Sequence, residues 1–383
     1  MLNADLPRPT LIQDEAAFQR LLNRLEKQAA IAVDTESNSL HAYREQVCLI
    51  QISIPGTDYL VDPLALDHLG ALGPVFANRD IVKVLHGAEY DVLCLGRDFN
   101  FQLVNLFDTR VASRTLGWKK SGLGDLLHQV FNVNVDKRFQ RANWGKRPLS
   151  DEMLDYARLD THYLLALRTH LIQELDQYKL KDQVLELCEW MALVPPSENG
   201  FDPEAFWRIS HARELSHRQA AILRELNLMR DQLAHDQNRP AFKILSDSIL
   251  LLIAKQAPRS EQQLQSQVGL TARQVDRFAR SILAAVERGL TAPLPRKPRG
   301  NHRNDAVVGR YEALREWRKG IARQRRVESD IILPRDLMET LARKAPHDKN
   351  SLKTLMQPLD WRFRTYGSQI LSILKKYGRQ GDA

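Results

Sequence analysis

The sequence has few cysteines, and they lie far apart. Cys48, Cys94 and Cys188 are the only three among 383 residues, and each is in an apolar context. An odd number of widely spaced cysteines supports neither a disulfide framework nor a zinc site. We therefore expect three buried structural thiols.

Long apolar runs are also missing. The longest, residues 249–254, is far shorter than the ~20 residues of a membrane-spanning helix. The first seven residues lack the basic start and apolar core of a secretory signal. We therefore expect a cytoplasmic protein with no membrane partner, and nothing in the sequence points to a small-molecule cofactor.

Charge is distributed unevenly along the chain. Residues 1–200 carry 21 Lys and Arg against 27 Asp and Glu, a net of −6, whereas residues 201–383 carry 34 against 20, a net of +14. A strongly basic half favours a polyanionic partner, most often nucleic acid, over an ordinary solvated surface.

The first 190 or so residues alternate between strand and helix patterns, which is typical of an α/β domain. Residues 87–97 predict a helix, and a helical region begins at Asp151 with Ser150 as its N-cap. Strands are predicted at residues 29–33, 47–53, 58–61, 80–85 and 103–107, the first three as a meander.

Two proline-rich stretches divide the chain, residues 195–200 and the basic residues 293–300. Beyond the first, strand signals disappear and amphipathic helices dominate. The predicted domains are an α/β domain at 1–195, a helical domain at 205–292, a basic proline-rich linker at 293–303 and a second helical domain at 304–383.

The two helical domains repeat one sequence. At a constant offset of 88 residues, ten positions are identical without a gap. They are Leu226/Leu314, Arg230/Arg318, Ala234/Ala322, Leu245/Leu333, Ala254/Ala342, Ala257/Ala345, Pro258/Pro346, Leu264/Leu352, Ile282/Ile370 and Leu283/Leu371. This register predicts two copies of one small all-α fold.

Acidic residues stand out at three places in the α/β domain. Asp34 and Glu36 follow the first predicted strand, and strand side chains alternate, so both point to the same face. Asp91 lies on the next predicted helix, and Tyr156 and Asp160 are four residues apart on a later helix, so they share a face. Each group alone would also fit an ordinary solvated surface.

In combination the three groups are specific. The order Asp-x-Glu, Asp, Tyr-x-x-x-Asp resembles the DEDD superfamily of 3′-5′ exonucleases in its tyrosine branch. Similarity to the ribonuclease D family in particular lies in Leu49-Ile50-Gln51-Ile52, Asn143-Trp144 and Arg147-Pro148-Leu149. The resemblance implies a ribonuclease H-like mixed sheet with flanking helices, and release of 5′-mononucleotides from RNA 3′ ends, with tRNA precursors as substrates.

The same resemblance implies the roles of the five residues. Asp34, Glu36, Asp91 and Asp160 would hold two divalent metal ions, and Tyr156 would position the attacking water. The residue types suit this chemistry, because clustered carboxylates repel by ~4 kcal/mol per close pair at an effective dielectric of about 20. Mg²⁺ prefers such oxygen ligands, with Mn²⁺ as an alternative, and a phenol with a pKa near ~10 orients water better than it removes a proton.

The repeated helical domains resemble HRDC modules, which follow the exonuclease domain in ribonuclease D. Their basic residues predict salt-dependent contacts to RNA phosphates, with Arg318, Lys319 and Arg323 as candidates. His86 and Arg147 are candidate substrate contacts in the α/β domain, and a structural role for both is equally open.

Two other functions stay open at this point. The same carboxylates would serve a DNA 3′-5′ exonuclease, because discrimination between the sugars depends on 2′-hydroxyl contacts that the sequence does not reveal. A nucleic-acid-binding scaffold with an inactive nuclease domain is the other alternative, although all five motif positions are intact.

Overall fold

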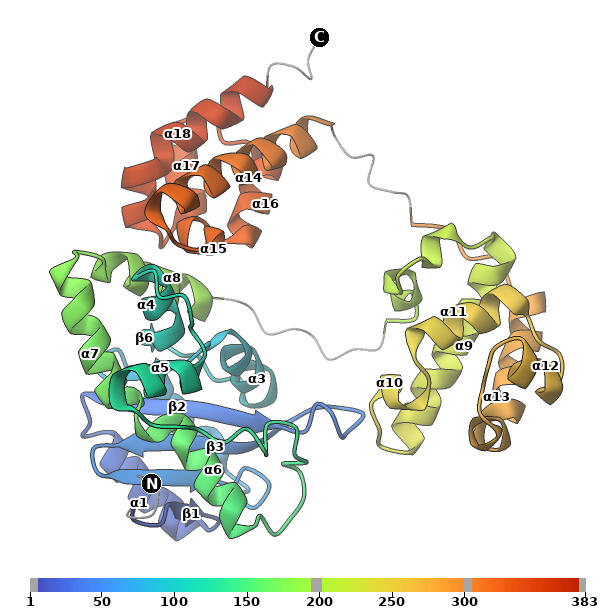
Figure 1. The fold of residues 1–383 in the computed structure, drawn as a ribbon, viewed down its shortest axis with the longest axis horizontal. Helices are drawn as coiled ribbons and strands as arrows, with labels where there is room; N and C mark the ends of the chain where they lie inside the picture. Colours follow the sequence, from blue (N-terminus) through green and yellow to red (C-terminus); the bar gives the residue numbers. More distant parts are fainter. Residues whose placement is uncertain (1–5, 194–201, 299–304, 379–383) are drawn as a thin grey trace. The chain divides into compact units, whose positions relative to one another are not determined.

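A computed structural model describes residues 6–193, 202–298 and 305–378 (Figure 1). Contacts divide the chain into two units, each described by itself below. Unit 1 comprises Met1–Ser37, Val47–Glu198 and Arg303–Ala383, and unit 2 comprises Asn38–Gln46 and Asn199–His302. The predicted boundary at 195–200 and the linker residues 299–303 lie outside the described residues, so the domain limits stay predictions.

A six-stranded mixed sheet forms the centre of unit 1. Its strand order is β1-β4-β3-β2-β5-β6. The expected antiparallel meander is confirmed as β2, β3 and β4, while β1, β5 and β6 pair in parallel with β4, β2 and β5. The strands are β1 (Thr10–Ile12), β2 (Ala30–Ser37), β3 (Val47–Ile54), β4 (Thr57–Val61), β5 (Val82–Leu85) and β6 (Leu106–Asp108).

Strand β3 shows why the sheet forms here. All eight of its residues are buried, as expected for a central strand covered on both faces. The sequence pattern did not predict β1, whose three residues are too few to show a period. Along β3, Ile50 and Ile52 join the core on the α1 side, whereas Leu49 packs with residues of α6 on the other face.

Helices cover both faces of this sheet. Helix α1 buries four apolar side chains on one face, and α6 lies across β2, β3 and β4 on the other (Figure 1). The helices of this part are α1 (Glu15–Leu25), the 3-10 turn η1 (Leu69–Leu72), α2 (Gly73–Ala77), α3 (Glu89–Phe99), α4 (Thr109–Thr115), α5 (Leu123–Phe131), α6 (Asp151–His162), α7 (Leu164–Gln177) and α8 (Lys181–Ala192).

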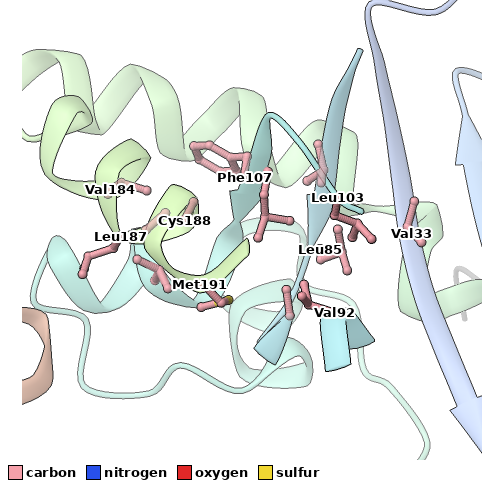
Figure 2. Close-up of a cluster of buried hydrophobic side chains, with 14 of the residues drawn as sticks. Val33, Leu85, Val92, Leu103, Phe107, Val184, Leu187, Cys188 and Met191 are labelled. Atoms are coloured by element: carbon pink, nitrogen blue, oxygen red, sulfur yellow. The ribbon is translucent and has the colours of Figure 1, made fainter. Parts of the chain in front are cut away.

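Helix α8 closes the far end of the sheet. Figure 2 shows its side chains Val184, Leu187, Cys188 and Met191 among apolar residues of β2, β5, β6 and α3. The Cys188 sulfur accepts a hydrogen bond from the Asp108 amide at 3.2 Å. All three cysteines are buried, as predicted.

Unit 2 holds the first helical repeat together with Asn38–Gln46. The Tyr43 hydroxyl donates to both Asp231 carboxylate oxygens at 2.8 and 2.9 Å, and its amide donates to Asn238 Oδ1 at 3.1 Å. The Tyr43 ring also meets His235 edge-on. The helices are η2 (Ala205–Arg208), η3 (Ala212–Glu214), α9 (His217–Asp236), α10 (Ala241–Ile244), α11 (Asp247–Gln256), α12 (Glu261–Ser266) and α13 (Ala272–Thr291).

The second repeat has the same fold as the first. Arg230 Nη1 donates to the Leu245 carbonyl at 3.0 Å, and Arg318 Nη1 donates to the Leu333 carbonyl at 2.9 Å. Ala257 and Ala345, which end equivalent helices, both adopt a φ of 45°. Its helices are α14 (Asp305–Arg325), α15 (Ser329–Ile332), α16 (Arg335–Lys344), α17 (Lys349–Met356) and α18 (Asp360–Gly378).

A buried ion pair fixes the second repeat to α8 within unit 1. Arg362, which is fully buried, pairs with Glu186 and also donates to the carbonyls of Gln183, Ile331 and Ile332. Glu186 accepts further bonds from the Trp361 and Arg362 amides. Burial raises the pKa of Glu186 and lowers that of Arg362 despite the pairing.

No helix within the described residues is long and apolar enough to cross a membrane.

Replacement of Arg362 should destabilise unit 1 strongly. Arg362→Met would leave the Glu186 carboxylate buried without its partner, and breaking a buried pair in this way costs about 3–5 kcal/mol. Chemical denaturation measures the free energy of unfolding. The control is Arg335→Met, because Arg335 forms an exposed pair with Glu339, and water screens such pairs so that they contribute little. Equal losses in the two variants would contradict the prediction.

Candidate active site

Two carboxyl side chains leave the same face of β2. Asp34 pairs with Gln51 of β3, and Glu36 pairs with Leu49, so both acidic residues point toward the face that α6 covers. The strand continues to Ser37, so Asp34 and Glu36 lie within β2 rather than after it. The predicted common face of the two carboxyls is thereby confirmed.

Asp91, on α3, lies close to the carboxyls of Asp34 and Glu36. It lies in the first turn of this helix and is 6% exposed. The Thr35 hydroxyl, on the strand residue between Asp34 and Glu36, donates to Asp91 Oδ1 at 2.5 Å. This bond ties α3 to β2 and brings the second motif to the first.

Asp108, which sequence reasoning did not single out, anchors the start of α3. Its carboxylate accepts hydrogen bonds from the Gly87 and Ala88 amides, at 3.1 and 2.7 Å, and from the Arg110 and Val111 amides, at 2.7 and 3.0 Å. Gly87 has a φ of 73°, a conformation that glycine adopts without strain. An Asp that ends a short strand and caps the next helix was the available sequence signal.

Helix α6 contributes Tyr156 and Asp160. Ser150 caps the helix as predicted, and its hydroxyl accepts from the Met153 amide. At the other end, Thr161 Oγ1 and Ser53 Oγ are 2.7 Å apart, and His162 Nδ1 lies 2.8 Å from Asp58 Oδ2. These two contacts hold the end of α6 that carries Asp160 on β3 and β4.

The four carboxyls act on one another electrostatically. Burial, followed by Asp91, Asp160 and Glu36, raises the pKa of Asp34, and burial followed by Asp160 and Asp91 raises the pKa of Glu36. Burial also raises the pKa values of Asp91 and Asp160 to about 7. The structure therefore brings the four predicted metal ligands into one acidic cluster, in which Asp91 is buried and Asp34, Glu36 and Asp160 are partly buried.

The cluster suits cations by its chemistry. Within the described ranges, no three His, Cys, Asp or Glu side chains are already placed to hold one metal ion, so binding would require these side chains to move. Hard divalent cations prefer carboxylate oxygens. Positive charge would favour the ionised carboxylates, which burial and, second to it, repulsion from neighbouring carboxyls now disfavour.

Tyr156 stands one helical turn before Asp160 and is 8% exposed. Phe139 meets its ring edge-on at 5.7 Å, and Trp144 lies 6.1 Å away at a tilt. Burial, followed by the charges of Asp160, Glu36 and Asp34, raises the pKa of its hydroxyl well above the ordinary value. Tyr156 therefore stays a neutral hydrogen-bond donor at the edge of the acidic cluster.

The guanidinium of Arg147 forms all of its hydrogen bonds within the α/β domain. Its Nε and Nη2 donate to the Asp62 carboxylate at 2.7 and 2.6 Å, and the other donors reach the carbonyls of Trp144, Lys146 and Cys48. All five N–H groups of a guanidinium are thereby used. This geometry supports the structural role that the sequence left open, while a contact of Arg147 with substrate stays a prediction.

His86 lies directly after β5, half-buried. Its Nδ1 is 2.9 Å from Thr109 Oγ1, and burial lowers the pKa of its imidazole. The loop that contains it leads into α3, so His86 is close in sequence to Asp91. Its contact with substrate stays a prediction.

The basic candidates on α14 differ in their surroundings. Arg318 is half-buried and donates to the Leu333 carbonyl, as its counterpart Arg230 does in the first repeat, which indicates a structural role. Lys319 pairs with Glu316 at 2.7 Å on the surface. Arg323 is exposed. Phosphate binding by the three stays a prediction, and Lys319 and Arg323 are the better placed for it.

Comparison with known families agrees with this geometry. Residues 9–176 match the 3′-5′ exonuclease family, and residues 219–286 and 308–374 each match the HRDC domain. The two HRDC matches confirm the predicted repeat. These matches define the class of protein: a 3′-5′ exonuclease domain followed by two HRDC domains.

Relatives narrow the class further. The chain is 29% identical to ribonuclease D of Jannaschia sp. over 365 residues, which is 92% of this chain and 91% of that protein. The structure of Escherichia coli RNase D has the same fold, with a TM-score of 0.71, 24% identity, and coverage of 97% of this chain and 100% of that one. The chain is therefore similar to ribonuclease D along nearly its whole length, and its 3′-5′ exonuclease domain implies dependence on divalent metal.

A longer relative shares only part of its length with this chain. The Caenorhabditis elegans exosome complex component 10 homolog is 34% identical over 258 residues, which is 65% of this chain. The chain spans 29% of that protein. The shared region is therefore no evidence that this chain assembles with other proteins.

Without metal, the protein should lose stability as the pH rises. Aspartate in an unfolded chain titrates near pH ~4. Asp91 and Asp160 titrate at about 7 in the fold. Between these values the folded state binds more protons than the unfolded state, so the free energy of unfolding falls as pH increases.

Thermal unfolding in chelator tests this expectation. The Tm should be several degrees lower at pH about 8 than at pH about 5.5, at roughly 2–4 °C per kcal/mol for a domain of this size. Asp91→Asn combined with Asp160→Asn should flatten the difference. A Tm that stays constant or rises with pH would contradict the assignment of shared repulsion to these carboxyls.

Proposed function

We propose that this chain hydrolyses RNA from its 3′ end and releases 5′-mononucleotides at the site formed by β2, α3 and α6. The observation that supports the proposal is the partly buried cluster of Asp34, Glu36, Asp91 and Asp160, whose pKa values are all raised. Gathering four carboxyls at a partly buried site is a costly arrangement unless cations bind them.

The four carboxyls would hold two divalent metal ions, most simply Mg²⁺, with Mn²⁺ as an alternative. Two such ions, when bound, supply a charge clamp for the attacking and leaving oxygens of an in-line phosphoryl displacement. Asp34 would be one of the ligands, and its pKa is raised by burial and then by all three of the other carboxyls. Glu36, Asp91 and Asp160 would complete the two sets of ligands.

Tyr156 would position the attacking water. Its raised pKa keeps the phenol protonated, so it can donate or accept a hydrogen bond but is a weak general base. The aromatic contacts of Phe139 and Trp144 restrain its ring. Its contribution would therefore be orientation.

The substrates would be RNAs with accessible 3′ ends, and tRNA precursors with 3′ extensions are our specific proposal. The support is the likeness to ribonuclease D along nearly the whole chain, including both HRDC domains. Exposed basic residues such as Arg323 would hold RNA phosphates in a salt-dependent way. We further propose that the protein acts in the cytoplasm.

Degradation of labelled RNA tests the proposal directly. A 5′-labelled RNA with an unstructured 3′ tail should shorten from its 3′ end in Mg²⁺ and stay intact in chelator, while DNA of the same sequence should resist. Degradation of both would indicate a general 3′-5′ exonuclease. Binding without cleavage in Mg²⁺ or Mn²⁺ would instead indicate a binding scaffold and overturn the proposal.

The variant Tyr156→Phe should lower turnover while metal affinity is retained. Loss of one positioning hydrogen bond, worth about 1–1.5 kcal/mol, predicts a decrease in kcat of roughly tenfold. The matched control is Tyr163→Phe at the end of the same helix, where the ring stacks on Phe131 instead. Unchanged kcat in Tyr156→Phe would exclude the positioning role.

A further inference from the structure

One polar side chain in the middle of the sheet has no hydrogen-bond partner. Gln51 is 0% exposed, and among the described residues neither its amide nitrogen nor its amide oxygen forms a hydrogen bond. Buried amides are nearly always paired, because an unpaired one has lost its water without compensation. We therefore expect the Gln51 amide to have a hydrogen-bond partner that is not among the described bonds.

The strand register shows where this side chain points. Gln51 lies directly opposite Asp34 in the β2–β3 pair and opposite Leu60 in the β3–β4 pair. Residues opposite one another in a ladder leave the same face, with Cβ atoms about 4.5–5.5 Å apart. The Gln51 amide is thus a cross-strand neighbour of the central carboxylate of the acidic cluster.

Within the β2–β3–β4 ladder, the other neighbours of Gln51 are apolar or already hydrogen-bonded. Leu60 across the strand and Leu49 along it are apolar and buried. Ser53, next along the strand in the other direction, already donates to Asp58 and meets Thr161. Asp34 is the neighbour in the ladder that carries acceptor oxygens and a charge in need of compensation.

We propose that Gln51 is a positioning residue for Asp34: its amide nitrogen donates to the Asp34 carboxylate in the cation-loaded state and fixes the orientation of that carboxylate. The inference rests on the proposed metal-dependent function. Groups that hold a ligand in this way typically change metal affinity by 10- to 100-fold when they are removed. Among the described residues the amide has no other partner, so a bond to Asp34 would satisfy a buried donor.

Tyr59 provides a matched control on the next strand. Its hydroxyl also lacks a partner among the described residues, and the residue is 4% exposed. It lies opposite Ile52, however, so it points to the other face, where Arg24 stacks over its ring. Tyr59→Phe therefore removes an unpaired buried polar atom that lies on the opposite face of the sheet from the carboxyls.

The experiment compares Gln51→Met with Tyr59→Phe in the full chain. Methionine keeps the length of glutamine and lacks both amide atoms, and Gln51→Leu serves as a second variant should the first not fold. Thermal unfolding in chelator measures the stability of the metal-free protein. Titration with Mn²⁺ alone, followed by electron paramagnetic resonance, measures the affinity of the site.

The expected result separates metal affinity from stability. Gln51→Met should keep or raise the metal-free Tm while Mn²⁺ affinity falls at least tenfold, and Tyr59→Phe should keep wild-type affinity. Wild-type Mn²⁺ affinity in Gln51→Met would overturn the positioning role alone. A lowered metal-free Tm would also overturn it, because it would show that the amide already has a structural partner. Absence of Mn²⁺ binding by the wild type would instead overturn the proposed function.

Discussion

The gathering of four carboxyls at one partly buried site is the constraint on which the rest of unit 1 depends. Asp34 and Glu36 come from one strand, while Asp91 and Asp160 come from two helices that approach that strand separately. Burial, followed by repulsion from neighbouring carboxyls, raises their pKa values. The fold therefore holds these groups together at a cost.

Polar contacts outside the cluster resist that repulsion. Asp108 binds four backbone amides at the start of α3 and α4, and the contacts Ser53–Thr161 and Asp58–His162 hold α6 on the sheet. Apolar packing of α8 against β5, β6 and α3 completes the support (Figure 2). Arg362 and Glu186 in turn attach α8 to the second HRDC domain, so rigidity extends beyond the sheet.

The sequence predicted the acidic residues well, because strand and helix periodicity alone put Asp34 with Glu36 and Tyr156 with Asp160 on common faces. It could not show what surrounds a charged side chain. Arg147 and Arg318 were candidates for substrate because they are basic, yet both donate to carbonyls of their own fold. Gln51 was visible in the sequence only as part of the stretch Leu49-Ile50-Gln51-Ile52 that resembles ribonuclease D, because a single sequence does not show which residue lies opposite it in the sheet.

The helical repeat also shows how a duplicated surface can diverge while its framework stays fixed. Asp231, His235 and Asn238 of the first copy, which receive Tyr43, correspond at the offset of 88 to Lys319, Arg323 and Arg326 in the second. The arginine that bonds the leucine carbonyl is retained in both. The first copy thus uses this surface to bind a loop of its own chain. The second copy carries basic residues at the same positions, so a ligand that binds one of the two surfaces would not bind the other.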